Sequence, residues 1–191
     1  LAWYKKSAAQ GFAAAQFELG VIYTQGWGVQ PDPAIVLHWY RKAADQNITD
    51  AQFNLGQMYL KGHGVVRNYS TAAHWFRKAA ELGDASAQNN LGTLYANGHG
   101  VPKDMHGAAQ WYLKAARQNN ANSQKNLGIA YSNGAGLPKD YVRAFAWLNV
   151  ASANGNKGAL LTRNKVMREM TREQIVQGQA LTKNLLAKSG R

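Results

Sequence analysis

The sequence contains no cysteine, and this absence removes several classes of function at once. A chain without thiols forms no disulfides, offers no thiol nucleophile and gives no thiolate ligand to a metal. The sequence also lacks any run of about eighteen apolar residues, the length that a transmembrane helix requires. We therefore expect no segment that crosses a membrane. Because cysteine is absent, the sequence does not indicate whether the compartment is oxidising or reducing.

Acidic residues are scarce in this chain. Ten Asp and Glu stand against 22 Lys and Arg, so the formal net charge is +12. Residues 157–191 hold eight of the basic residues and two Glu, which makes this segment more basic per residue than the rest. A net positive charge attracts acidic proteins, anionic lipid or nucleic acid, but it does not indicate which of these is the partner. Because the few acids are explained as helix caps or solvent-facing residues, we expect no enzymatic activity.

A block of 36 residues occurs four times in succession without insertion or deletion. Self-similarity at this period is typical of a solenoid, in which stacked units share one elongated core. Residues 1–13 match the second half of such a block, so we expect an incomplete unit there and any export signal upstream. The recurring large residues are Leu19, Leu55, Leu91 and Leu127; Tyr23, Tyr59, Tyr95 and Tyr131; and Trp39, Trp75, Trp111 and Trp147.

Each repeat is predicted to form two antiparallel helices, called here the first and the second helix. In the first repeat, Ala15, Leu19 and Ile22 form an apolar stripe at helical spacing, and Gly26 ends the first helix. The second helix buries an i, i+3, i+4, i+7, i+8 set that begins at Val36. Short polar residues at equivalent positions are the predicted N-caps of the second helices, namely Asp32, Asn68, Asp104 and Asp140.

The second helices are predicted to end at a column that holds only Asn and Gly, the residues most tolerant of positive φ. This column consists of Asn47, Gly83, Asn119 and Gly155. We expect Asp50, Ser86 and Asn122 to cap the first helices that follow.

The repeat pattern breaks after Ala159, and the remaining chain is predicted to form a pair of capping helices. Residues 171–174 match a capping box that opens a last helix ending near Lys188. The apolar residues expected to face the stack are Leu160, Leu161, Val166, Met167 and Met170, then Ile175, Leu181, Leu185 and Leu186. The alternative is a basic amphipathic helix that lies on a membrane or binds a partner.

The chain resembles the bacterial Sel-1-like repeat family, a relative of the tetratricopeptide repeat. The resemblance is carried by Ala-Gln-Asn-Asn-Leu-Gly-Thr-Leu-Tyr-Ala-Asn-Gly-His-Gly-Val-Pro-Lys-Asp at 87–104 and by Ala-Ala-Gln-Trp-Tyr-Leu-Lys-Ala-Ala at 108–116. It implies an all-α fold, a right-handed α/α superhelix whose first helices line the concave side. We expect a solenoid over 1–158, with a half repeat at 1–13 and full repeats near 15–50, 51–86, 87–122 and 123–158, followed by capping helices at 159–191.

The resemblance also implies a role as a bacterial adaptor or scaffold that binds another protein. The family supplies no general catalytic residues and no cofactor, and it favours a periplasmic or exported location. One subgroup has disulfide-linked repeats, and the lactam binding associated with it is not carried over to a chain without cysteine.

Partner binding is expected at positions that differ between repeats and lie opposite the apolar stripe of the first helices. Two interpretations of Phe17 and Phe53 stay open, because these rings either bind a partner or pack between successive units. The amide residues among these positions either clamp a peptide backbone or only confer solubility. The candidates are Phe17, Val21, Gln25, Phe53, Asn54, Gln57, Leu60, Lys61, Asn90, Thr93, Asn97, Asn126, Ile129 and Asn133.

The second helices carry a basic ladder, defined as Lys5, Lys6, Arg41, Lys42, Arg77, Lys78 and Lys114. We interpret it as a solvated outer face, since it lacks the outward aromatic residues that stack on nucleic-acid bases. Two pairs of histidines, His38 with His74 and His63 with His99, are one repeat apart. That spacing is too wide for ligands of one zinc ion, so no metal site is expected.

The sequence therefore predicts a non-enzymatic scaffold that binds a peptide or protein on the face made by the first helices. A narrower alternative is an immunity or inhibitor protein that neutralises a secreted bacterial toxin. An alternative from another class is a basic surface that binds nucleic acid or an anionic membrane. Steep loss of affinity with rising salt would indicate that last class.

Overall fold

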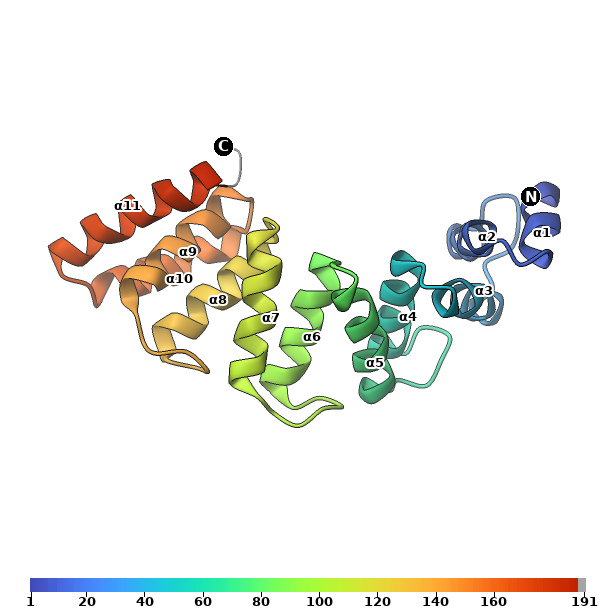
Figure 1. Ribbon diagram of the computed structural model, residues 1–191, viewed down its shortest axis with the longest axis horizontal. Helices are drawn as coiled ribbons and strands as arrows, with labels where there is room; N and C mark the ends of the chain where they lie inside the picture. The colour runs from blue at the N-terminus through green and yellow to red at the C-terminus, as the bar shows by residue number, and fades with distance from the viewer. Residues whose placement is uncertain (189–191) are drawn as a thin grey trace. The chain divides into compact units, whose positions relative to one another are not determined.

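The computed structural model describes residues 1–188, which form eleven α-helices and, over this range, no β-strand (Figure 1). The helices α2 to α9 each contain 13 residues and alternate as the first and second helices of four repeats. This arrangement confirms the predicted all-α solenoid of helix pairs. The helices are α1 (Ala2–Ala9), α2 (Ala13–Gln25), α3 (Pro33–Asp45), α4 (Thr49–Lys61), α5 (Tyr69–Glu81), α6 (Ala85–Asn97), α7 (Met105–Arg117), α8 (Ala121–Asn133), α9 (Tyr141–Ala153), α10 (Lys157–Arg168) and α11 (Arg172–Lys188).

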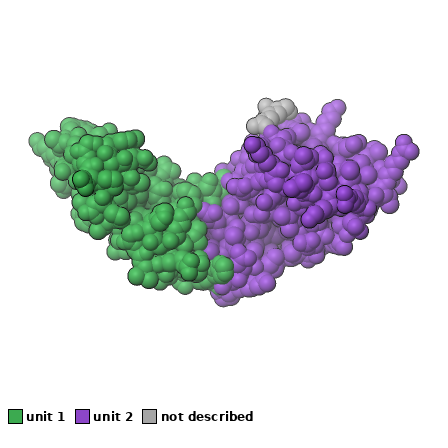
Figure 2. Space-filling model, turned by 180° about the vertical axis from the view of Figure 1, so that it is seen from behind, with its two compact units in different colours: residues 1–87, 99–101 green, residues 88–98, 102–191 purple. Residues whose placement is uncertain are grey.

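The chain divides into two compact units, which Figure 2 shows in separate colours. Unit 1 consists of residues 1–87 and 99–101, and unit 2 consists of residues 88–98 and the described residues from 102 onward. In the described part of the chain, no helix combines the length and the apolar character needed to cross a bilayer.

The predicted N-caps of the second helices and the positive-φ residues predicted at their ends are confirmed. Each predicted N-cap accepts a hydrogen bond from a backbone N–H of the first turn, as at Asp104, whose Oδ1 lies 2.9 Å from the nitrogen of Gly107. Each second helix is also followed by a positive-φ residue, with φ of 63° at Asn47 and 99° at Gly83. The predicted capping box forms as well, because Thr171 N donates to Gln174 Oε1 at 2.9 Å and Gln174 N donates to Thr171 Oγ1 at 3.2 Å.

The predicted caps of the first helices were wrong by two residues. Asp50, Ser86 and Asn122 lie inside α4, α6 and α8, and the flanking residue of α8 is Asn120, whose Oδ1 accepts from Ser123 N. The chain leaves each second helix through one positive-φ residue and starts the next helix immediately afterwards. At α4 the flanking residue is Ile48, which packs against the core of unit 1 and makes no side-chain cap.

The core follows the recurring columns. The four leucines Leu19, Leu55, Leu91 and Leu127 are fully buried. A glycine beside each leucine lets the second helix approach, because a Cβ on Gly56 would lie only 2.6 Å from the ring of Phe76. An aromatic ring of the second helix thus packs directly against the backbone of the first helix in three repeats, and Leu148 takes this place in the fourth.

A buried glutamine follows the same repeat. Gln16, Gln52 and Gln124 each donate from Nε2 to an alanine carbonyl of the preceding second helix at 3.0–3.2 Å. The side-chain oxygens of Gln16 and Gln124, and that of Gln88, accept hydrogen bonds of 2.8–2.9 Å from Gln46, Asn154 and Gln118, respectively. Leu82 occupies the donor position in the remaining repeat, and Gln52 Oε1 is buried without a partner among the described residues.

The capping helices agree with the prediction only in part. Val166 is buried, and Met170, Ile175 and Leu185 pack against the core of unit 2. Leu161 is 70% exposed, and Leu160 and Met167 are also exposed, so these three residues do not face the stack as expected. Since α11 packs against α9, it leaves this side of α10 uncovered.

Candidate partner-binding groove

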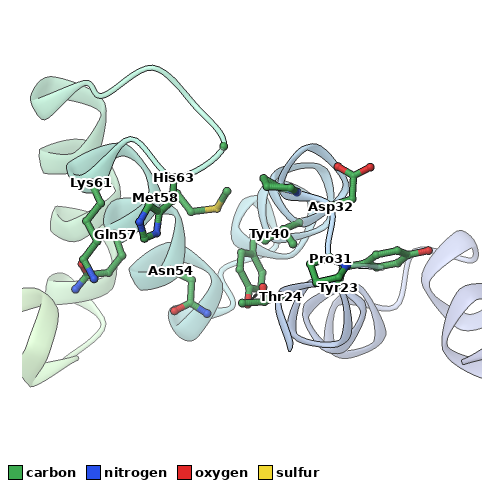
Figure 3. A pocket seen from close by; sticks show the side chains of 13 residues that line it. Tyr23, Thr24, Pro31, Asp32, Tyr40, Asn54, Gln57, Met58, Lys61 and His63 are labelled. Atoms are coloured by element: carbon green, nitrogen blue, oxygen red, sulfur yellow. Dashed lines mark hydrogen bonds between the residues drawn. The ribbon is translucent and has the colours of Figure 1, made fainter. Parts of the chain in front are cut away.

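Unit 1 contains a groove of about 410 Å³ that lies between α2 and α3 on one side and α4 on the other (Figure 3). We call it the unit 1 groove. Its lining residues are Tyr23, Thr24, Pro31, Asp32, Pro33, Val36, Tyr40, Asn54, Gln57, Met58, Lys61, His63 and Gly64.

Helical spacing places three candidate residues on one wall of this groove. Asn54, Gln57 and Lys61 are separated by three and four residues on α4, so they lie on one face of the helix. Val36 and Met58 are almost fully buried and form an apolar floor. The groove therefore combines an apolar base with an amide-rich and basic wall.

The opposite wall is held by hydrogen bonds. Thr24 Oγ1 donates to the carbonyl of Gly20 at 2.7 Å and lies 3.2 Å from the hydroxyl oxygen of Tyr40. Burial raises the pKa of the Tyr40 hydroxyl above its ordinary value, against the opposing effect of its hydrogen bonds with Thr24 and Asn54. The phenol therefore remains protonated near neutral pH and can take part in hydrogen bonds as a neutral group.

Two polar side chains on the α4 wall are not used by the fold. Among residues 1–188, no hydrogen bond or ion pair is made by the side chains of Gln57 or Lys61. Gln57 is half-buried and Lys61 is exposed. An amide offers both donors and an acceptor, and an ammonium offers donors and a positive charge.

Unit 2 contains a corresponding groove of about 580 Å³, formed three repeats further along the chain. Three of its lining residues are equivalent to residues that line the unit 1 groove: Ser132 corresponds to Thr24, Tyr141 to Pro33 and Val166 to Met58. The charges differ, because Lys139, Lys165 and Glu169 occupy the positions of Pro31, Gln57 and Lys61. Equivalent positions of the repeat thus line a groove in both units, but the charged residues in the two grooves differ.

The pKa of Lys139 is raised mainly by its interactions with Tyr141, with a smaller contribution from the charge of Glu169. Its ammonium lies 4.7 Å from the centre of the Tyr141 ring. The unit 2 groove therefore keeps a positive charge across the neutral pH range.

The grooves bring together some of the predicted residues and not others. The unit 1 groove gathers Asn54, Gln57 and Lys61, and the unit 2 groove gathers Ile129 and Asn133. Asn126 lies outside these grooves and donates to Asn89 Oδ1 at 3.2 Å. The remaining candidates lie at the surface to differing extents: Val21, Leu60, Asn90 and Thr93 are half-buried, whereas Gln25 and Asn97 are exposed.

The two phenylalanines are half-buried against the second helix of their own repeat. The ring of Phe17 stacks on Tyr40 at a centroid distance of 5.8 Å, and the ring of Phe53 lies 5.9 Å from that of Phe76. Both rings keep some exposed surface, so partner contact by Phe17 and Phe53 remains a prediction.

Sequence reasoning missed the contributions of Tyr40 and the two prolines to the groove. Tyr40 was assigned to the core, where most of its ring indeed lies, since it is only 5% exposed. Its hydroxyl nevertheless reaches the groove. The sequence offered one indication of this, because Tyr40 carries a hydroxyl group among the otherwise apolar core positions of the second helix.

The basic ladder rests on tryptophans of the same helices. The ammonium groups of Lys42, Lys78 and Lys114 lie 5.4, 5.1 and 4.2 Å from the centres of the rings three residues earlier. Trp75 is almost fully buried, whereas Trp39 and Trp111 are half-buried. In the described part of the chain, no three His, Asp or Glu side chains gather in a way that could hold a metal ion.

A family model described as Sel1 repeat matches five consecutive segments of the chain, at residues 1–12, 13–48, 49–84, 85–120 and 121–156. A search of curated proteins found no match.

Several solved structures are similar to this chain. A Sel1 repeat protein from Oxalobacter formigenes is 39% identical, with a TM-score of 0.79 over 84% of this chain and 66% of that one. The antigen c5321, described as protective and present in uropathogenic Escherichia coli strains, is 34% identical, with a TM-score of 0.65 over 97% of this chain and 48% of that one. Immunity protein Pa5087 from Pseudomonas aeruginosa is 24% identical, with a TM-score of 0.52 over 97% of this chain and 70% of that one, so it shows the fold alone. This chain spans about two thirds of the Oxalobacter protein and about half of the E. coli antigen.

Proposed function

Because this chain belongs to the Sel1 repeat family, we propose that it is a non-enzymatic scaffold that holds a segment of a partner protein in the unit 1 groove. Repeats of this family generally mediate protein–protein interaction. The proposal adds a location and a mode of binding to that general role.

The observation that carries the proposal is the coexistence of an apolar floor and unused polar groups in one groove. An extended peptide presents backbone N–H and C=O groups in alternation, and the amide of Gln57 can bind both. The floor at Val36 and Met58 can accept an apolar side chain of the same peptide. Lys61 favours an acidic residue beside that apolar anchor.

The size of the groove also suits a segment better than a folded surface. A volume of about 410 Å³ lies at the lower end of the range of about 300–1,000 Å³ that is common for ligand pockets. Such a volume holds one or two side chains.

Quantitative affinity capture from the source cell tests the proposal. The immobilised protein is compared with a Gln57→Ala, Lys61→Ala variant and with a His38→Ala, Lys42→Ala control on α3. We expect the groove variant to lose at least about tenfold in captured partner, which corresponds to about 1.4 kcal/mol. The control should retain it. If the groove variant and the control variant capture equal amounts of partner, the proposal that the partner binds in the unit 1 groove is contradicted.

A salt series on the captured complex distinguishes the alternatives. A groove dominated by apolar and amide contacts predicts a shallow dependence on salt. Nucleic acid or an anionic membrane predicts a steep loss, because counterions are released on binding. A folded toxin as partner would support the immunity alternative and would require the whole partner domain, whereas the proposal requires that a short segment competes for binding.

A further inference from the structure

A second pocket lies in unit 2, where α11 packs against α9, and its volume is about 480 Å³. Figure 1 shows α11 running beside α9. The pocket is separate from both grooves and shares no lining residue with either of them. We infer that it binds a small amphipathic anion, of which a medium-chain carboxylate is the simplest example.

Three helices each contribute apolar residues and a cation to this pocket. On α11, Leu181, Leu185 and Lys188 follow i, i+4, i+7 spacing and therefore share one face. On α9, Arg143, Trp147 and Val150 follow the same spacing, with Trp147 and Val150 almost fully buried. On α7, Leu113 and Arg117 are four residues apart.

The charge of the pocket is one-sided. Its lining includes three cations, Arg117, Arg143 and Lys188, and no Asp or Glu. Arg143 is partly neutralised, since its Nε lies 3.3 Å from Asp140 Oδ2. Arg117 and Lys188 make no hydrogen bond or ion pair with any described residue. Arg117 is also particular to its repeat, because the equivalent positions hold Asp45 and Glu81.

The combination of an apolar wall and uncompensated positive charge selects the class of ligand. An inorganic anion would satisfy the cations but would leave the leucines and Trp147 in contact with water. A neutral apolar molecule would cover the wall but would remove water from the cations without pairing them, which is unfavourable. A molecule with an apolar chain and one anionic head satisfies both, and the volume lies within the usual range of about 300–1,000 Å³ for small-molecule sites.

Calorimetric titration of the protein with sodium octanoate tests this inference, with 1-octanol and sodium acetate as matched ligands. We expect octanoate to bind with one-to-one stoichiometry and both matched ligands to bind at least about tenfold more weakly. A second matched pair consists of protein variants. Arg117→Gln with Lys188→Gln should weaken octanoate binding at least about tenfold. The control Lys183→Gln, on an exposed position of α11 outside the pocket, should bind as the unmodified chain does.

Far-UV circular dichroism of each variant verifies that the helices are intact. A Leu181→Asn variant provides a second readout, because it changes the apolar wall without changing the charge and should also weaken octanoate. Failure of octanoate to bind, equal binding of octanoate and octanol, or unchanged octanoate binding by the Arg117→Gln, Lys188→Gln variant overturns the inference. The result is independent of the unit 1 groove, so Gln57→Ala with Lys61→Ala should leave octanoate binding unchanged.

Discussion

Replacement of Leu82 by glutamine is expected to stabilise the protein. The side-chain oxygens of Gln16, Gln88 and Gln124 accept hydrogen bonds from a glutamine or asparagine thirty residues later. Gln52 is fully buried, but Leu82 stands at the donor position of its repeat, and Gln52 Oε1 has no partner among the described residues. The sequence therefore contains one unfilled place in a repeated hydrogen-bond pattern.

The backbone at residue 82 can accommodate the replacement. Leu82 has φ −79° and ψ 1°, close to the φ −93° and ψ 19° of both Gln46 and Gln118. Leu82 is 54% exposed, so its side chain contributes only part of the free energy of full burial. The methylene groups of a glutamine would retain some of those contacts.

The magnitude follows from the cost of a buried unsatisfied acceptor, which is about 1–3 kcal/mol. After subtraction of the lost leucine contacts, we expect the Leu82→Gln variant to gain about 1 kcal/mol in the free energy of unfolding. For a chain of this length that gain corresponds to a rise of about 2–4 °C in Tm. Thermal unfolding followed by circular dichroism at 222 nm measures it.

Two control variants show whether the gain comes from Gln52. In a Gln52→Met background the Leu82→Gln replacement should bring no gain, because there is no acceptor to satisfy. The converse replacement, Gln118→Leu, should lower Tm by removing the donor to Gln88. A gain that persists in the Gln52→Met background would refute this explanation.

The remaining predictions concern packing, pH and the basic ladder. Gly56→Ala should destabilise the protein by about 1–3 kcal/mol despite the better helix propensity of alanine, because its Cβ would lie 2.6 Å from Phe76. The control Gly158→Ala has no neighbour within 3.4 Å and should not destabilise the protein. Urea denaturation measures the free energy of unfolding of both variants. Burial raises the pKa values of Tyr40 and Tyr112 above 10.0, so the stability gained from their neutral forms is fully present below pH 10 and is lost as pH rises through the raised values. Tyr40→Phe with Tyr112→Phe should flatten the fall in Tm above pH 10, and an unchanged slope would contradict it. Lys42→Glu with Lys78→Glu should leave partner capture unaltered, and a large loss would assign binding to the ladder.

The parts of the fold that were predictable are those fixed by local chemistry. Asp104 accepts a bond from the third residue of its own helix, and Asn47 tolerates positive φ, so both positions could be recognised from residue type and spacing. The start of α4 was misplaced because it depends on the packing of Ile48 and carries no polar cap. The exposure of Leu161 was missed because helical periodicity defines a face but does not show what covers it.

The same distinction applies to the site. Asn54, Gln57 and Lys61 could be grouped from the sequence because they share one helical face. The opposite wall could not, because the approach of Tyr40 and Thr24 depends on how α3 packs beside α2 and α4. The pocket beside α11 was likewise beyond sequence reasoning, since it depends on α11 packing against α9.

Site-specific photo-cross-linking in the source cell tests the central claim most directly. Benzoylphenylalanine replaces Gln57 in the unit 1 groove or, as a control, His38 on α3. We expect a discrete protein adduct from position 57 that disappears when Asn54→Ala and Lys61→Ala are added, and no such adduct from position 38. The absence of an adduct from position 57, or the same adduct from position 38, would contradict the proposal that this repeat protein binds its partner through the unit 1 groove.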